Sequence, residues 1–103
     1  MIIAFDIGGT KIAAARVGAD MAASEIGRVP TPVRDYDAFC AAIAELAGAG
    51  DEPIGISIAG VVDPRDGRLT VANIPCADGK PLAADLETSL GRRVRVLNDA
   101  KAF

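Results

Sequence analysis

Apolar runs separated by glycine-containing turns dominate the first thirty residues and predict strands. Residues 1–7 are rich in Ile and Phe, as in a buried strand. Residues 10–18 contain three adjacent alanines that would also suit a helix. The turn before them has only two or three residues, however, and residues 22–30 again favour a strand. We therefore expect three successive antiparallel strands, with tight turns at residues 8–9 and 18–20.

A helical period follows in residues 31–50. Asp35 or Asp37 can cap the start of this helix, and Gly48 and Gly50 would end it. Its apolar face would consist of Phe39, Ile43, Leu46 and Ala47.

The next part of the chain alternates strand and helix. Residues 53–62 form a continuous apolar run, as expected of a central strand covered on both faces. Turn residues and a short extended piece follow at 63–73. Residues 80–91 predict a helix with Pro81 in its first turn and Gly91 at its end. Its apolar positions are Leu82, Leu86 and Leu90.

The last residues predict one more strand and one more helix. Residues 93–97 alternate arginine with apolar residues, and residues 98–103 begin a helix. The order is therefore β-β-β-α-β-α-β-α, an α/β fold with a mixed sheet and no internal repeat or linker. The final helix has only about one turn and is too short to be stable alone. We expect either a fragment or a frayed end.

Composition narrows the classes of partner. The 103 residues suit one compact domain, and half of them are hydrophobic, which excludes low-hydrophobicity disorder. The net charge is -3 and the basic residues are scattered. The nearest approach to a basic cluster is Arg92, Arg93 and Arg95, which we expect to form a solvated strand entrance. No nucleic-acid partner is therefore expected.

The reactive residue types are few. The chain has no histidine, so acid–base chemistry must fall to a carboxylate. Cys40 and Cys76 lack C-x-x-C spacing, which favours a reduced cytoplasmic protein with two ordinary thiols. The apolar start is interrupted at Asp6 and is too short for a signal peptide or a membrane span.

The motif FDIGGTK places two glycines, a threonine and a lysine after a strand. A P-loop and a dinucleotide fingerprint both need a different glycine spacing and a following helix. In a hairpin tip, the N–H groups of Gly8, Gly9 and Thr10 can approach phosphate, since glycine has no Cβ. The Lys11 ammonium and the Thr10 hydroxyl add donors, and Asp6 suits a water-bridged Mg²⁺. A plain Gly-Gly hairpin with an exposed lysine fits the spacing equally well.

Asn98 and Asp99 follow the last predicted strand, in the first turn of the final helix. The helix dipole keeps a carboxylate ionised there, which suits a base that accepts a hydroxyl proton. The neighbouring amide can orient sugar hydroxyls. Ordinary N-capping is the alternative, and both roles can hold together.

Four segments carry a resemblance to a known family. In order they are FDIGGTK, IAGVVDPRDG, ANIPCADGKPLAADLE and VRVLNDAKAF. Together they resemble the amino-terminal lobe of the ROK (repressor, open reading frame, kinase) family, most closely its N-acetylglucosamine kinases. That family belongs to the actin and heat-shock ATPase superfamily, whose two ribonuclease-H-like lobes close over a cleft. The resemblance implies that residues 1–103 are one lobe, ending before the second.

The resemblance also implies an activity: ATP-dependent phosphorylation of N-acetylglucosamine at its 6-hydroxyl, with Mg²⁺, and an inactive isolated lobe. Asp99 would be the catalytic base, and Asn98 would bind ring hydroxyls. The first phosphate-contacting loop for ATP would comprise Asp6, Gly8, Gly9, Thr10 and Lys11. The sugar site would be lined by Gly60, Asn73, Asp78 and Gly79, for which turn formation is the alternative.

Other family features would lie beyond residue 103. These are the second phosphate loop, the adenosine pocket, an E-x-G-H sugar contact and a Cys/His zinc site. Structural zinc is thus expected only in the second lobe, and the full-length protein is expected to be a cytoplasmic homo-oligomer. Lys101 replaces the usual Asn and is expected to face solvent. A glucokinase, an N-acetylmannosamine kinase, a sugar-sensing repressor lobe and a non-catalytic sugar-binding or dimerisation lobe remain alternatives.

Overall fold

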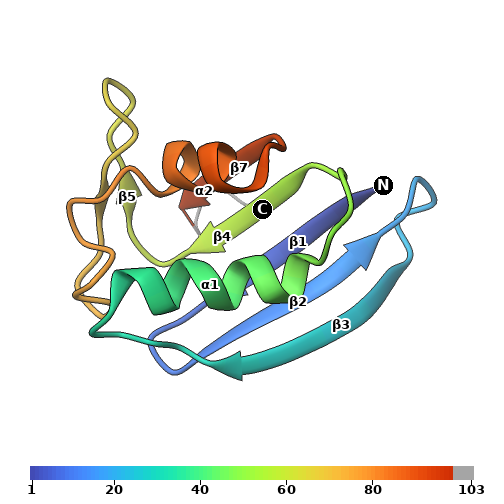
Figure 1. Cartoon of the computed structure of the whole chain (residues 1–103), viewed down its shortest axis with the longest axis horizontal. Helices are drawn as coiled ribbons and strands as arrows, with labels where there is room; N and C mark the ends of the chain where they lie inside the picture. The colour runs from blue at the N-terminus through green and yellow to red at the C-terminus, as the bar shows by residue number, and fades with distance from the viewer. Residues whose placement is uncertain (99–103) are drawn as a thin grey trace.

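The structure is a computed structural model that describes residues 1–98. Within them a five-stranded sheet has the order β3-β2-β1-β4-β7, and two helices cover one of its faces (Figure 1). A separate two-stranded sheet pairs β5 with β6. The strands are β1 (Ile2–Ile7), β2 (Lys11–Val17), β3 (Ala23–Pro30), β4 (Ile54–Ile58), β5 (Val61–Val62), β6 (Leu69–Thr70) and β7 (Val94–Asn98), and the helices are α1 (Tyr36–Ala47) and α2 (Leu82–Leu90).

The first three strands form the predicted antiparallel meander. β1 pairs with β2, and β2 pairs with β3 at the edge of the sheet. The first hairpin is closed by a hydrogen bond of 3.0 Å from the N–H of Gly8 to the carbonyl of Lys11. This short closure keeps the alanine-rich segment extended and paired, so its helical propensity is overridden.

Strands β1, β4 and β7 run parallel, with β4 in the middle. Parallel neighbours need long crossover connections. Helix α1 lies in the crossover to β4, and α2 lies in the crossover to β7. The carboxyl ends of the three strands therefore meet at one edge of the sheet, on the left in Figure 1.

The helix ends follow their capping residues, with one difference from the prediction. The Asp35 side chain accepts a 3.1 Å hydrogen bond from the N–H of Ala38, so Asp35 is the cap of α1. Gly48 ends this helix at a φ of 72°. Helix α2 begins at Leu82, because Pro81 occupies the N-cap position and does not lie within the first turn.

The apolar run over residues 53–62 is not one strand, contrary to the prediction. β4 ends at Ile58, and the following valines form β5 in the small sheet. The chain changes sheet at Gly60, where a Cβ would lie 2.7 Å from the carbonyl oxygen of Thr70. Only glycine permits so close a backbone approach, and hydrophobicity alone could not reveal it.

Arg92 is buried and not solvated, which corrects a second prediction. Its side chain is 2% exposed. The guanidinium donates from Nε to the Glu52 carbonyl at 2.9 Å and from Nη1 to the Gly48 carbonyl at 3.1 Å. Its Nη2 donates to Glu52 Oε1 at 3.3 Å. Arg92 thus joins the end of α1 to the start of β7, whereas Arg93 and Arg95 are exposed as predicted.

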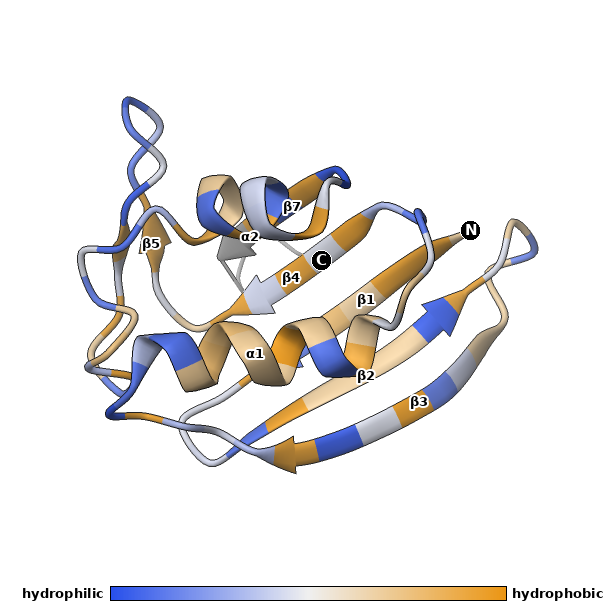
Figure 2. Ribbon diagram, viewed as in Figure 1, coloured by the Kyte–Doolittle hydropathy of each residue, from blue (hydrophilic) through white to orange (hydrophobic). Residues whose placement is uncertain are grey.

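The core lies between the sheet and the two helices. Phe39 and Ile43 of α1 pack there together with Leu82 and Leu86 of α2, and apolar residues continue along the strands beneath them (Figure 2). Alternate strand residues supply the other half of the core: Ile3, Phe5, Ile7, Ile12, Ala14, Ile54, Ile56, Ile58 and Val94. None of the helices within residues 1–98 is long and apolar enough to span a bilayer.

Candidate active site

The carboxyl ends of the parallel strands bring three predicted segments to one edge. Ile7 of β1 is level with Ile58 of β4, and Ile58 is level with Asn98 of β7. The glycine loop, the Gly60 turn and the end of β7 therefore begin side by side. In open α/β sheets, ligands bind in the crevice outside these strand ends. Asp99, the predicted catalytic base, lies outside the described residues.

The glycine loop, Gly8–Thr10, is held by backbone bonds that partly change its expected chemistry. The N–H of Gly8 is already donated to Lys11, so it is not free to meet phosphate as predicted. Within residues 1–98, no acceptor takes the N–H of Gly9 or of Thr10. Free backbone amides on a turn are groups with which proteins bind anions, so these two N–H groups are available to a phosphate.

Thr31, which the sequence analysis did not identify, fixes the other side of this loop. Its Oγ1 donates a 2.7 Å hydrogen bond to the Gly8 carbonyl, and its N–H donates a 3.0 Å bond to the Thr10 carbonyl. The sequence signal is the Pro-Thr-Pro stretch at residues 30–32, which stiffens the end of β3.

The charged residues on either side of the glycine loop are available to a ligand. Asp6 and Lys11 are exposed, and their strand positions place them on the face opposite the helices. Within residues 1–98 neither forms an ion pair. A lysine suits phosphate as a point charge. A single exposed carboxylate suits Mg²⁺, which takes one or two carboxylates and otherwise keeps waters and phosphate oxygens.

Gly9 also connects the loop to the predicted sugar side. A Cβ at Gly9 would lie 3.1 Å from both Nδ2 and the carbonyl oxygen of Asn73. The structure therefore brings Asn73 against the glycine loop, although the two are far apart in the sequence. A side chain at Gly9 would press on Asn73 before it met any phosphate.

Asp78 and Gly79 hold the segment that carries Asn73. Asp78 Oδ1 accepts a 3.0 Å hydrogen bond from the N–H of Val71. Gly79 has a φ of 77°, which favours glycine, and its N–H donates to the carbonyl of Leu69 at 2.7 Å. These bonds fit the alternative that both are turn residues, and they fix where Asn73 lies.

Side chains of the helices anchor the same segment. Lys80 Nζ lies 5.4 Å from the centre of the Tyr36 ring, and the Tyr36 hydroxyl donates a 2.7 Å bond to Asp85. Burial, followed by the hydrogen bond to Asp85, raises the pKa of Tyr36. Burial also raises the pKa of the Cys40 and Cys76 thiols, both of which are free. A raised pKa makes a thiol a weaker nucleophile at neutral pH, and both side chains pack against the hydrophobic core.

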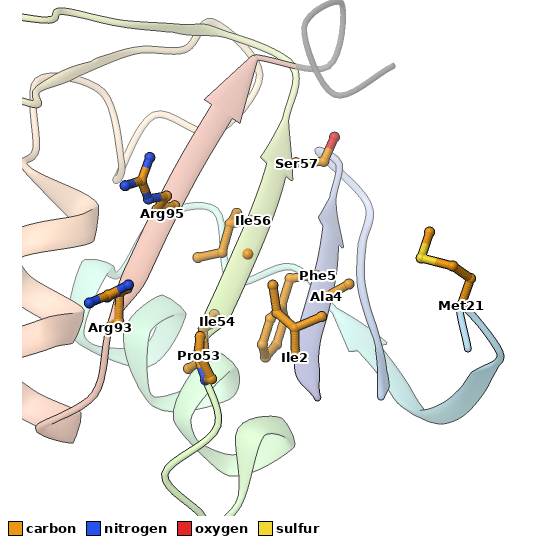
Figure 3. Close-up of a pocket in the computed structure, with 11 residues that line it drawn as sticks. Ile2, Ala4, Phe5, Met21, Pro53, Ile54, Ile56, Ser57, Arg93 and Arg95 are labelled. Carbon is orange, nitrogen blue, oxygen red and sulfur yellow. The ribbon is translucent and has the colours of Figure 1, made fainter. Parts of the chain in front are cut away.

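A groove of about 650 Å³ lies on the open face of the sheet and extends along β4 as far as Ser57 (Figure 3). Ile2, Ala4 and Gly55 belong to its apolar lining, with Arg93 and Arg95 along one side. None of the predicted site residues within 1–98 lines it. The same part of the chain holds no group of three or more potential metal-binding side chains. The candidate site is therefore the strand-end edge.

Comparison with known proteins agrees with this geometry. The ROK family model matches residues 2–103. The chain is 45% identical to an N-acetyl-D-glucosamine kinase of Shigella flexneri, an alignment that covers 100% of this chain and 36% of that protein. A ROK hexokinase of Thermus thermophilus superposes with a TM-score of 0.84 at 35% identity, covering 98% of this chain and 36% of that one. A ROK glucokinase of Streptomyces griseus, solved with glucose and AMPPNP, superposes with a TM-score of 0.82 at 33% identity, covering 98% and 34%.

Proposed function

Because this chain belongs to the ROK family, and its fold is that of the ROK sugar kinases, we propose that it is the amino-terminal lobe of an ATP-dependent kinase of N-acetylglucosamine. The observation that carries the proposal is the contact of the glycine loop with Asn73 at the edge formed by β1, β4 and β7. One edge thus offers anion-binding amides beside a polar amide side chain. The chain spans 36% of the length of the relative it matches, so we expect the isolated lobe to lack turnover.

The glycine loop is the phosphate side of this site. The N–H groups of Gly9 and Thr10, the Thr10 hydroxyl and the Lys11 ammonium donate to phosphate oxygens of ATP. Gly8 contributes through the hairpin bond that shapes the loop. Asp6 is the residue that would hold Mg²⁺, and the ion would supply charge neutralisation at the phosphates. Phosphoryl transfer needs chiefly positioning and charge neutralisation, which these groups provide.

The sugar side is formed by residues of the neighbouring strand ends. Asn73 and Asn98 bind sugar hydroxyls through their amides. Asp99 accepts the proton of the 6-hydroxyl as that oxygen attacks the γ-phosphate, a role that requires no histidine. Gly60 permits the sheet change that brings the Asn73 segment to this edge. Asp78 and Gly79 act by holding that segment in place.

The whole kinase extends the proposal beyond these residues. A second lobe completes the nucleotide and sugar sites and carries a structural zinc site. The full-length protein is cytoplasmic and forms a homo-oligomer, and its partner is a small sugar.

The test is release of ADP with MgATP and a panel of N-acetylglucosamine, glucose and N-acetylmannosamine. It is run on residues 1–103 and on the product of the uninterrupted reading frame. We expect turnover only in the longer product, highest with N-acetylglucosamine, and a loss of about 10²–10⁴-fold in Asp99→Asn.

Other outcomes separate the alternatives. Highest turnover with glucose or N-acetylmannosamine would assign another kinase of the same family. Sugar binding without turnover in the longer product would reject the kinase and favour a sensor or binding lobe.

A further inference from the structure

Thr31 binds both ends of the glycine loop from one position. Its hydroxyl donates to the Gly8 carbonyl at 2.7 Å, and its backbone N–H donates to the Thr10 carbonyl at 3.0 Å. Two of the loop carbonyls thus point toward the end of β3. They are thereby turned away from any anion that the loop binds.

The first of these bonds also determines the direction of an N–H group. The Gly8 carbonyl and the Gly9 N–H belong to the same planar peptide, in which the two groups point in opposite directions. Since the carbonyl points to Thr31, the Gly9 N–H points away from it. Within residues 1–98 this N–H has no acceptor.

A peptide between two glycines needs such a restraint. Gly8 and Gly9 lack Cβ atoms and can adopt backbone conformations that other residues avoid. Rotation of the whole peptide plane would therefore meet little steric resistance. A rotated plane would present the Gly8 carbonyl in place of the Gly9 N–H, and an acceptor would then face the anion.

The end of β3 is well suited to hold this peptide. Pro30 and Pro32 flank Thr31; a proline fixes its own φ and also restricts the residue before it to extended conformations. The β-branched side chain of Thr31 has few rotamers. Little conformational entropy is therefore lost when its hydroxyl bonds to Gly8.

We propose that Thr31 is a positioning residue for nucleotide phosphate: its hydroxyl keeps the Gly8–Gly9 peptide oriented so that the Gly9 N–H donates to a phosphate oxygen. The inference rests on the proposed nucleotide role of the glycine loop. Thr31, which directly follows the edge strand β3, thereby contributes to phosphate binding without contacting the phosphate.

The test compares Thr31→Val with Thr31→Ser in the intact kinase. Valine keeps the shape and the backbone N–H but removes the hydroxyl, whereas serine keeps the hydroxyl. We expect Thr31→Val to raise the KM for ATP about 3- to 10-fold, the size expected for one hydrogen bond. The KM for the sugar should change less than about 2-fold, and Thr31→Ser should restore the KM for ATP. The matched control is Thr88→Val on the exposed side of α2, which should leave both KM values unchanged.

A second measurement covers a variant that fails to fold. In the unmodified protein, the ¹⁵N–¹H resonance of Gly9 should shift when MgATP is added. An unshifted Gly9 resonance, an unchanged KM for ATP in Thr31→Val, or an equal rise in both KM values would each overturn the proposal. Absence of turnover with every sugar would reject the kinase activity. The MgATP-induced shift of the Gly9 resonance, compared between the unmodified protein and Thr31→Val, would still test Thr31 separately.

Discussion

Two arginines contact the same carboxylate, and only one of them should matter for stability. Arg92 Nη2 lies 3.3 Å from Glu52 Oε1, and the Arg92 side chain is 2% exposed. Arg16 Nε lies 3.2 Å from Glu52 Oε2, and the Arg16 side chain is 43% exposed. The contact distances are nearly equal, so burial is the main difference between the two ion pairs.

Arg92→Met should lower the free energy of unfolding because two backbone carbonyls lose the guanidinium as their hydrogen-bond donor. The carbonyls of Gly48 and Glu52 each lose a charged donor, at 3.1 and 2.9 Å. A hydrogen bond to a charged group contributes about 1.5 kcal/mol or more, so two of them give about 3 kcal/mol. Methionine fills much of the same space, which keeps the packing term small. Glu52 retains Arg16, so no unpaired buried charge adds to the cost.

The assay is urea unfolding followed by far-ultraviolet circular dichroism at neutral pH. Arg92→Met should lower the free energy of unfolding by about 3 kcal/mol, while Arg16→Met should leave it nearly unchanged, as for other exposed ion pairs. Arg92→Lys should fall between them, because an ammonium cannot reproduce the planar fork of donors. Equal effects of Arg92→Met and Arg16→Met would refute the argument that the buried bonds of Arg92 to the two carbonyls decide.

Three further predictions concern the site, pH and the thiols. Gly9→Ala should raise the KM for N-acetylglucosamine in the intact kinase by pushing Asn73 away; a rise confined to the KM for ATP would contradict this. The pKa of Glu52 is lowered, chiefly by its own backbone amide and then by Arg16. The ionised Glu52 carboxylate therefore stabilises the fold fully above the ordinary pKa of a glutamate, and this contribution is lost as the pH falls through the lowered pKa of Glu52 in the folded protein. Glu52→Gln should remove this contribution to the pH dependence of the free energy of unfolding, measured by urea unfolding. Cys40 and Cys76 should react with a disulfide reagent at pH 7 more slowly than in urea, since burial raises the pKa of both thiols; equal rates would show that they are not protected.

Much of the fold could be predicted because local signals agree with the tertiary structure. Glycine turns set the hairpin of β1 and β2 despite the three alanines, and Asp35 and Gly48 set the ends of α1. The apolar period along α1 identified its buried face, with Phe39 and Ile43 fully covered. In α1, propensity, pattern and capping specify the same element, whereas in β2 the short turn and the strand pairing override the helical propensity of the alanines.

The two wrong predictions, at Gly60 and Arg92, concern residues whose environment is formed by segments far away in the sequence. A Cβ at Gly60 would lie 2.7 Å from the carbonyl oxygen of Thr70, and no residue near Gly60 in the sequence indicates this close approach. The sequence around Arg92 is typical of an exposed arginine. Its burial depends on the carbonyls of Gly48 and Glu52, which are about 40 residues away in the sequence and accept its hydrogen bonds.

The sequence predicted several residues of the candidate site but not the contacts between them. The glycine motif identified the loop, but its Gly8 N–H is used within the hairpin, and Thr31 was not identified. Asn73 was proposed from family resemblance, and its contact with Gly9 is visible only in three dimensions. Asp99 lies outside the described residues, so its role stays a prediction.

The segment between β4 and α2 has a consequence for how such a lobe can diversify. The chain leaves the main sheet after β4 and enters α2 only at Leu82, and the two strands between them, β5 and β6, belong to the separate small sheet. Exchanges at the exposed positions of this excursion would leave the hydrogen-bonded frame of the sheet intact, because exposed loop positions tolerate change far better than paired strands. Leu69, Val71, Ile74 and Ala77 are buried in the core and hold the excursion in place. The glycine loop, by contrast, is tied into that frame through β1, β2 and the end of β3. Substitutions at the exposed positions of the excursion can therefore change the proposed sugar side without altering the strands that hold the glycine loop, and only those near Asn73 would also reach that loop.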